Sequence, residues 1–335
     1  ERPTQDVEPQ HFAYQEVAVA ALQKGEVLLK SHYLNIAPVM RMYMMEGGGG
    51  YSTEKLLNIG DVIHGRGVGE VIDSKHPDFA VGDFVHGQIG WQTYKITTAT
   101  KQEKFVKMKQ RNVPIHYGLS ALGMTGYSAY CGFMDRGQPK KGDIILVSGA
   151  AGGVGSLVVQ IAKAIGCGRV VGIAGGKAKC EVVKSLGADD MIDYKNEDVA
   201  SRVKELLPDG FDVFFDNVGG EILDHALDNM RLGARIVLCG GIAEYALKEP
   251  FGPKNYGKLR MKGADMRGFF VYYHAANFEK AETDIAHWIN EGKLRALVDM
   301  QDGFEQMPSA LIGLYTGTNT GKRIVKVSEG AEIVY

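Results

Sequence analysis

The stretch ILVSGAAGGVGSLVVQIAKAIG, residues 145–166, decides the fold of this chain. It begins as an apolar run typical of a buried strand, breaks into glycines, and continues with apolar residues at helical spacing. Gly149, Gly152 and Gly155 form a Gly-x-x-Gly-x-x-Gly turn between the strand and the helix. Such a turn lets a phosphate group approach the backbone, and the helix start offers unpaired N–H groups with a partial positive charge. The pattern therefore predicts a dinucleotide-binding βαβ unit.

The rest of the chain divides by pattern into two domains, as its 335 residues suggest. Strand-like and helix-like segments alternate over residues 118–285, which predicts a doubly wound parallel sheet of the Rossmann type. Residues 1–117 carry short strand-like segments broken by Gly and Pro, which indicates a curled antiparallel sheet. We expect residues 286–335 to return to that first domain. The predicted fold class is therefore α/β with two domains.

Composition excludes several function classes. The net charge of −2 offers no general attraction to nucleic acid or to an acidic membrane, and the basic run KFVKMKQR (104–111) is interpreted as a solvated face. No apolar run approaches the ~20 residues of a membrane span. The four cysteines form no CxxC pair, which favours reduced thiols and a cytoplasmic protein, although their even number leaves disulfides open.

The end of the second strand of the predicted Rossmann domain bears on the choice of cofactor. NAD sites usually carry an acid there for the ribose 2′-hydroxyl, but this chain reads VVGIAGGKAKC, with Gly175, Lys177 and Lys179. Glycines leave room for a 2′-phosphate and lysines attract it, and Tyr194 and Lys195 after the next strand could join them. The lysines could also be ordinary solvated residues at a helix start. The missing acid favours NADPH.

A metal site is not expected. No cysteine precedes Cys131, and His64 is followed by no acid at a useful spacing. The chain has neither an HExxH motif nor a cysteine cluster. We therefore predict a reaction that needs no Lewis acid.

Several motifs along the chain resemble one family. VSGAAGGVGS, GIAGGKAKC, IDYKNED, FDVFFDNVGGEILD, RIVLCGGIAEY and GKRIVKV are similar to motifs of the zinc-independent medium-chain dehydrogenase/reductases. Within that family, the prostaglandin reductases, the plant double-bond reductases and above all the bacterial NADPH-dependent curcumin reductases are most similar. The resemblance covers nearly the whole chain. It implies a GroES-like distorted antiparallel barrel domain beside the Rossmann domain, with the active cleft between them.

The resemblance also implies an activity and an assembly. The expected reaction is NADPH-dependent reduction of the C=C bond of α,β-unsaturated ketones or aldehydes, such as curcumin-type dienones. Members of the family are commonly homodimers that pair the edge strands of their nucleotide domains, which here would lie around GFFVYY (268–273).

Tyr245 is the catalytic candidate that the resemblance implies. Hydride addition to the β-carbon leaves negative charge on the carbonyl oxygen, and a phenol can donate a hydrogen bond to that oxygen. The proton could come from Tyr245 or from water, and on sequence alone Tyr245 could equally be an ordinary loop aromatic.

The predicted cofactor-binding residues come from the glycine turn, the ends of the later strands and the C-terminal tail. In chain order they are Gly152, Gly153, Val154, Gly155, Gly175, Lys179, Tyr194, Asn217, Cys239, Gly240, Phe270, Val271 and Asn319. Asn217 could instead cap a helix, Asn319 could serve a turn, and Phe270 and Val271 could be core residues.

The substrate pocket departs from the family pattern. This chain reads IAPVMRMYM (36–44) where many relatives carry a tyrosine and a carboxylate, so we expect a less polar pocket. Candidates for its lining are Val39, Tyr51 and Tyr256. The glycine run 47–50 could be a mobile lid or a plain solvent loop.

Two other functions stay open at this point. The same machinery could reduce quinones, and the chain could be an NADPH-binding protein without turnover. Alcohol dehydrogenation is disfavoured because the residues for a catalytic zinc are missing.

Overall fold

The computed structural model describes residues 1–4, 6–46, 57–245, 247, 252–330 and 332–335. The chain forms two compact units. The first contains residues 1–123, 298–319 and 323–335, and the second contains residues 124–297 and 320–322. These boundaries lie some residues beyond the 117 and 285 expected from sequence. No helix in the described residues is long and apolar enough to cross a membrane.

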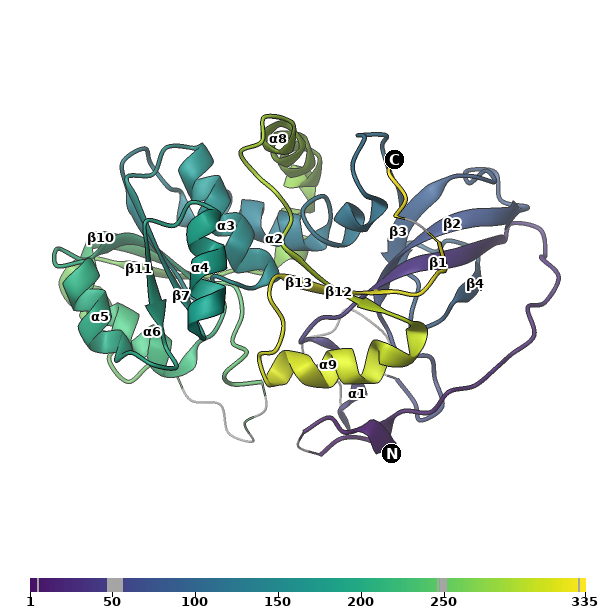
Figure 1. The fold of residues 1–335 in the computed structure, drawn as a ribbon, viewed down its shortest axis with the longest axis horizontal. Coiled ribbons are helices and arrows are strands. Elements are labelled where there is room, and N and C mark those ends of the chain that lie inside the picture. Colours follow the sequence, from purple (N-terminus) through teal and green to yellow (C-terminus); the bar gives the residue numbers. More distant parts are fainter. Residues whose placement is uncertain (5, 47–56, 246, 248–251, 331) are drawn as a thin grey trace. The chain divides into compact units, whose positions relative to one another are not determined.

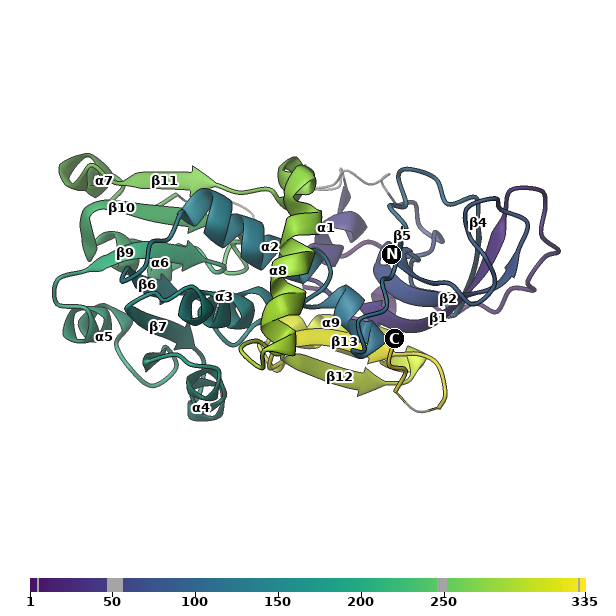
Figure 2. The same ribbon diagram turned by 90° about the horizontal axis from the view of Figure 1, so that it is seen from above.

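The second unit is built on a six-stranded sheet whose strand pairs are all parallel (Figures 1 and 2). Its strands are β6 (Ile144–Val147), β7 (Arg169–Ala174), β8 (Asp190–Asp193), β9 (Phe211–Asp216), β10 (Met230–Leu238) and β11 (Asp265–Gly268). Their order is β11-β10-β9-β6-β7-β8. The chain builds outward from β6 through β7 to β8, then returns to β9 on the other side of β6. The order therefore reverses between β6 and β9, which is where doubly wound sheets bind their ligands.

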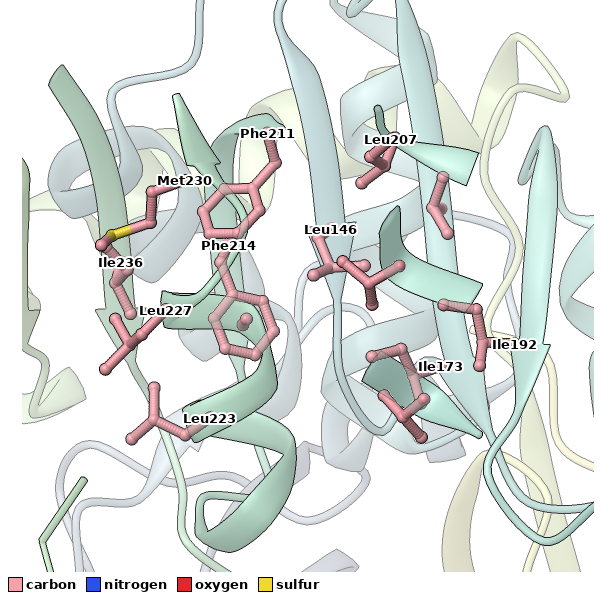
Figure 3. Close-up of a cluster of buried hydrophobic side chains, with 14 of the residues drawn as sticks. Leu146, Ile173, Ile192, Leu207, Phe211, Phe214, Leu223, Leu227, Met230 and Ile236 are labelled. Carbon is pink, nitrogen blue, oxygen red and sulfur yellow. The ribbon is translucent and has the colours of Figure 1, made fainter. Parts of the chain in front are cut away.

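Helices cover both faces of this sheet. They are α2 (Met124–Cys131), which continues in a π-helical turn η4 (Gly132–Gly137), α3 (Gly153–Ala164), α4 (Lys177–Ser185), α5 (Val199–Leu206), α6 (Gly220–Leu227), α7 (Gly257–Lys262), the 3₁₀ segment η5 (Val271–Asn277) and α8 (Phe278–Asn290). One face carries an apolar cluster that α5 and α6 cover, with Leu146, Phe214 and Leu223 inside it (Figure 3). Phe215, one residue on in β9, faces the opposite way and meets the ring of Phe133 at 6.4 Å between centroids. Full burial of such side chains stabilises the unit by about 1.5–3 kcal/mol each.

The first unit is an antiparallel sheet curled around β1. Its strands are β1 (Val27–Asn35), β2 (Arg66–Ser74), β3 (Phe84–Gln88), β4 (Tyr94–Thr97), β5 (Val106–Lys107), β12 (Val298–Asp302) and β13 (Lys322–Lys326). β1 pairs with β2 along one edge, while its other edge pairs first with β4 and then with β13. β1 thus pairs with three strands. This pairing curls the sheet, as in a barrel.

Short helical segments complete the first unit. They are η1 (Pro9–His11), α1 (Met40–Met44), η3 (Ile115–Leu119), η6 (Phe304–Gln306) and α9 (Met307–Tyr315). Leu311 and Leu314 of α9 are buried in one cluster with Leu29 and Val71 of the sheet. The predicted fold class, a strand-rich antiparallel domain with a parallel-sheet nucleotide domain, is confirmed.

One local expectation was wrong. The edge strand does not lie around GFFVYY (268–273), because β11 ends at Gly268 and a helical turn starts at Val271. The tail also contains a helix that the sequence analysis does not name, because α9 lies between β12 and β13.

Candidate active site

The glycine turn at the carboxyl end of β6 depends on very close backbone contacts. The N–H of Gly152 donates to the carbonyl oxygen of Gly149 at 2.9 Å, and Gly149 has a φ of +57°. A Cβ atom on Gly155 would lie 2.3 Å from that same carbonyl oxygen, nearer than any such contact allows. A side chain at position 155 would therefore force the turn apart, so glycine is required there.

The start of α3 differs from the starts of α5 and α6. The Asp198 carboxylate accepts from the N–H of Ser201 at 2.8 Å in α5, and the Glu244 carboxylate accepts from the N–H of Gly220 at 3.0 Å in α6. At α3 the cap residue is Gly152, which has no side chain to make such a bond. The positive end of α3 is thus not neutralised by its own cap, which suits a phosphate group.

A buried carboxylate connects the strands that flank the switch point. Asp216, the last residue of β9, has no exposed surface, and its Oδ1 accepts from the Ser148 hydroxyl at 2.6 Å and from the N–H of Val218 at 3.0 Å. Burial raises the pKa of this carboxyl, and the Ser148 hydrogen bond opposes that shift. The carboxylate thereby ties the end of β6, through Ser148, to the turn that starts α6.

Asn217 is held by the same group of contacts. Its backbone N–H donates to the Ser148 hydroxyl oxygen at 2.8 Å, and its side-chain Nδ2 donates to the Ser148 carbonyl oxygen at 2.8 Å. This bond orients the side-chain amide, whose Oδ1 atom can accept a hydrogen bond from a ligand. A Cβ atom on Gly149 would lie 3.3 Å from the Cβ of Asn217, so this side chain also borders the glycine turn.

Tyr245 lies beyond the carboxyl end of β10 and folds back over its own turn. The N–H of Gly241 donates to the Tyr245 phenol oxygen at 3.2 Å, and the N–H of Tyr245 donates to the Gly241 carbonyl oxygen at 3.2 Å. A Cβ atom on Gly240 would lie 3.1 Å from the Asn217 carbonyl oxygen and 3.5 Å from the Tyr245 phenol. The structure therefore brings Asn217, Gly240 and Tyr245 together.

Cys239, which precedes this pair of glycines, is not a nucleophile. Loss of solvent around its sulfur, together with the nearby Asp216 carboxylate, raises the pKa of the thiol to about 12. The thiol stays protonated at neutral pH, so the residue can contribute only its backbone and a weakly polar surface.

The turn between β7 and α4 carries the residues predicted to select the cofactor. A Cβ atom on Gly175 would lie 2.7 Å from the ring of Tyr194, so the ring packs directly on the glycine backbone. The Tyr194 side chain is 47% exposed, and Lys179 is half-buried in the first turn of α4. Gly175 and Tyr194 are thus in contact at the carboxyl edge of the sheet, and Lys179 lies in the helix that starts there.

Phe270 and Val271 also lie at this edge of the second unit. Phe270 caps η5 and Val271 is its first residue, and both are half-buried. The Phe270 carbonyl oxygen accepts from the N–H of Tyr273 at 3.1 Å, and the predicted contact of these two residues with a nicotinamide stays a prediction.

The remaining candidates belong to other parts of the chain. Asn319 and Val39 belong to the first unit. Tyr256 is 66% exposed at the start of α7, where its neighbour Asn255 bonds to the carbonyl oxygen of Asp224 in the second half of α6. α7 leads into the beginning of β11, at the opposite end of the strand from Phe270 (Figure 2). Tyr51 and the glycine run 47–50 lie outside the described residues.

Sequence reasoning missed the residues that support the glycine turn. Ser148, Asp216 and Glu244 hold the strand ends, and the N–H of Gly321 donates to the Ala151 carbonyl oxygen at 2.7 Å. The signal for Asp216 was present, because an acid ends the otherwise apolar run FDVFFD (211–216). A charge at the last position of a buried strand points to the carboxyl edge of the sheet.

Within the described residues there is no group of three or more His, Cys, Asp or Glu side chains that could hold a metal ion.

Comparison with known proteins relates both halves of the chain to oxidoreductases. Residues 153–287 match the family model described as zinc-binding dehydrogenase, and residues 1–105 match that of the N-terminal domain of oxidoreductase. The NADP(+)-dependent 2-alkenal reductase of Nicotiana tabacum is 41% identical over 91% of this chain and 88% of the relative. The NADPH-dependent curcumin reductase of Escherichia coli is 36% identical over 96% and 93%. The crystal structure of CurA from Vibrio vulnificus in complex with NADPH has 35% identity and a TM-score of 0.90, covering 98% of both chains.

Proposed function

The chain belongs to the medium-chain dehydrogenase/reductase family, and we propose that it reduces the C=C bond of α,β-unsaturated ketones and aldehydes with NADPH. It is an NADPH-dependent oxidoreductase of the alkenal and enone reductase group. One observation supports the reaction most directly. The glycine turn, with the positive end of α3, lies at the same sheet edge as Tyr245, whose phenol is fixed on the Gly240–Gly241 backbone.

The residues present fit NADPH. Gly152, Gly153, Val154 and Gly155 would hold the pyrophosphate on backbone N–H groups at the start of α3. Gly175, Lys179 and Tyr194 would surround the adenosine 2′-phosphate, with Lys179 as the cation. Asn217, Gly240, Phe270 and Val271 would border the ribose and the nicotinamide, and Asn319 is a further candidate for contact with the cofactor.

The role of Tyr245 follows from where charge develops. Bound NADPH supplies a hydride to the β-carbon of the substrate, which moves the C=C electron pair toward the carbonyl and leaves an enolate. The Tyr245 phenol donates a hydrogen bond to the enolate oxygen, where the negative charge is larger than in the ground state. A proton from Tyr245 or from water then bonds to the α-carbon, and the saturated carbonyl compound results.

The assay that tests this function follows oxidation of NADPH with a panel of substrates. We expect turnover with a conjugated enone, an enal and a curcumin-type dienone, and saturation of the C=C bond in the recovered product. A quinone tests the alternative reaction of the same machinery. Turnover of the quinone alone, or turnover of none, would overturn the proposal; the second result would favour an NADPH-binding protein without activity.

We also propose that the protein is a homodimer. β11 is the end strand of the six-stranded sheet and pairs with β10 on one side. Aromatic residues follow it, and Tyr273 is 86% exposed. A strand edge without a partner among the described strands, next to an exposed ring, suits pairing with the same strand of a second copy. Sedimentation equilibrium should give twice the chain mass, and a mass of one chain would contradict the proposal.

A cytoplasmic location is part of the proposal. The four cysteines are free thiols in the structure. Such thiols are compatible with a reducing compartment. Fractionation of the source cells, followed by activity measurement, tests this location.

A further inference from the structure

Asp193 is a buried acid at the edge where NADPH is proposed to bind. It is the last residue of β8, opposite Ala174 at the end of β7 in the parallel register, and only 9% of it is exposed. Between Asp190 and Asp193, the two ends of this strand, lie only the apolar residues Met191 and Ile192. A negative charge is unexpected beside a site for a 2′-phosphate, because the two would repel each other.

The Asp193 carboxylate collects three donors from two neighbouring turns. Its Oδ1 accepts from the N–H of Gly176 at 2.6 Å and from the N–H of Lys195 at 3.1 Å, and its Oδ2 accepts from Nδ2 of Asn196 at 2.7 Å. The Asn196 and Gly176 hydrogen bonds lower the pKa of this carboxyl, so it stays ionised. All three donors belong to the protein itself.

The two turns that Asp193 joins are the two sides of the 2′-phosphate surface. Gly176 has a φ of +96° and leads into α4, which carries Lys179. Lys195 follows Tyr194, whose ring packs on Gly175. The Tyr194 N–H is anchored on the Ala174 carbonyl oxygen at 3.1 Å. Asp193 therefore fixes the distance between the tyrosine ring and the start of α4.

We propose that Asp193 is a positioning residue for the 2′-phosphate of NADPH, acting through the hydrogen bonds that hold the Gly175–Gly176 turn against Tyr194 and not through its charge. The inference rests on the proposed function. An acidic residue would thus help to form a site that binds an anion. The hydrogen bonds of Asp193 would favour phosphate binding by more than its negative charge opposes it.

Two substitutions separate geometry from charge. Asp193→Asn keeps an oxygen for Gly176 and Lys195 and removes the charge, and the Asn196 amide can turn to accept from the new Nδ2. We expect NADPH to bind as tightly as to the wild type or up to about ten-fold tighter, with NADH unchanged. Asp193→Ala removes all three bonds, and we expect NADPH to bind about ten-fold or more weakly while NADH changes much less.

The measurement is the dissociation constant of NADPH and of NADH by nucleotide fluorescence, with the melting temperature of each variant. Asp190→Ala is the matched control, because Asp190 begins the same strand and pairs with Arg169 at 2.7 Å. It should leave the ratio of the two constants unchanged. Gly175→Ala is an independent variant that places a Cβ atom 2.7 Å from the Tyr194 ring, and it should also reduce the preference for NADPH.

The possible results are distinct. If Asp193→Ala keeps the wild-type ratio of the NADPH and NADH constants, or if Asp193→Asn weakens NADPH as much as Asp193→Ala does, the inference is wrong. If Asp193→Ala does not fold, Gly175→Ala decides, and an unchanged preference overturns the inference. A wild-type protein that binds both nucleotides equally would contradict the cofactor assignment itself.

Discussion

The backbone N–H of Gly241 donates a hydrogen bond to the phenol oxygen of Tyr245, four residues later in the same turn, at 3.2 Å. The phenol oxygen is the acceptor in this bond. The bond also fixes the ring on the turn that follows β10. A phenol oriented in this way can donate to an oxygen that gains negative charge, without reorganisation at the moment of reaction.

Tyr245→Phe should therefore lower kcat for an enone by about 100-fold, the usual effect of removing one donor to a developing oxyanion. The dissociation constant of NADPH should change little, because the phenol is assigned to the substrate. Steady-state kinetics and nucleotide titration together measure both effects.

Tyr94→Phe is the control for this substitution, because it removes a partly exposed phenol from β4 in the first unit. It should leave kcat unchanged. Equal kcat values for Tyr245→Phe and the wild type would remove Tyr245 from the mechanism.

Lys179→Met should weaken NADPH binding by roughly ten- to a hundred-fold and leave NADH binding unaffected, because a charge-assisted hydrogen bond contributes about 1.5–3 kcal/mol. Lys184→Met is the matched control, since Lys184 is exposed in the last turn of the same helix. Titration with the two nucleotides measures the effect. A parallel loss of NADH affinity, or the same loss in Lys184→Met, would show that the lysine at 179 does not act on the 2′-phosphate.

The doubly wound half of the fold was predictable because its local signals agree. Gly187, with a φ of +109°, follows the end of α4, and Ala281 and Ile285 of α8 are buried at helical spacing. The glycine turn was predictable for the same reason, since a strand, a bare turn and a helix start follow one another without interruption.

The sequence pattern was weaker where tertiary contacts decide the structure. α9 buries Met307, Ala310, Leu311 and Leu314 at helical spacing. The helix was not predicted, because Gly313 lies inside it and no side chain caps its start. The edge strand was expected around GFFVYY (268–273), but pairing with β10 ends at Gly268.

The supports of the site could not be found from a motif. Asp193 and Asp216 act through hydrogen-bond donors that sequence distance does not reveal. Asp193 accepts from the N–H of Gly176, and Asp216 accepts from the Ser148 hydroxyl. Only the parallel packing of the strands brings these groups together.

Gly155→Ala should destabilise the second unit by about 1–3 kcal/mol and abolish tight NADPH binding, because the added Cβ atom would lie 2.3 Å from the Gly149 carbonyl oxygen. Gly257→Ala tests the same change where nothing lies within 4 Å, at the start of α7, and should be neutral or slightly stabilising. Urea unfolding and NADPH titration measure both variants. If Gly155→Ala binds NADPH with wild-type affinity, glycine is not required at position 155.

Prolonged treatment with a strong zinc chelator should leave activity unchanged. The described residues hold no group of three or more potential metal ligands, and the proposed mechanism stabilises the enolate with Tyr245. Activity is measured after dialysis against the chelator and again after zinc is added. Activity that is lost and then returns with zinc would contradict a reaction without a metal.

The first unit should lose stability as the pH falls from 6.5 to 5. His86 in β3 is buried, and Nη2 of Arg66 lies 3.3 Å from its Nδ1. Burial, and secondly the Arg66 charge, lower the pKa of His86 to about 3. In the unfolded chain the histidine binds a proton as the pH falls through about 6.5, whereas in the folded chain it does not. The free energy of unfolding therefore falls by about 1.4 kcal/mol for each pH unit below 6.5 and for each such histidine.

Burial also lowers the pKa of His32 and of His116, so both add to this slope in the same direction. Urea unfolding followed between pH 7.5 and 5 measures it. This window lies above the ordinary titration of carboxylates, which would otherwise dominate acid unfolding. His86→Gln should flatten the slope, because glutamine cannot take up the proton, whereas His287→Gln, at an exposed position in α8, should not. If both variants keep the wild-type slope, the buried His86 is not a source of the acid sensitivity.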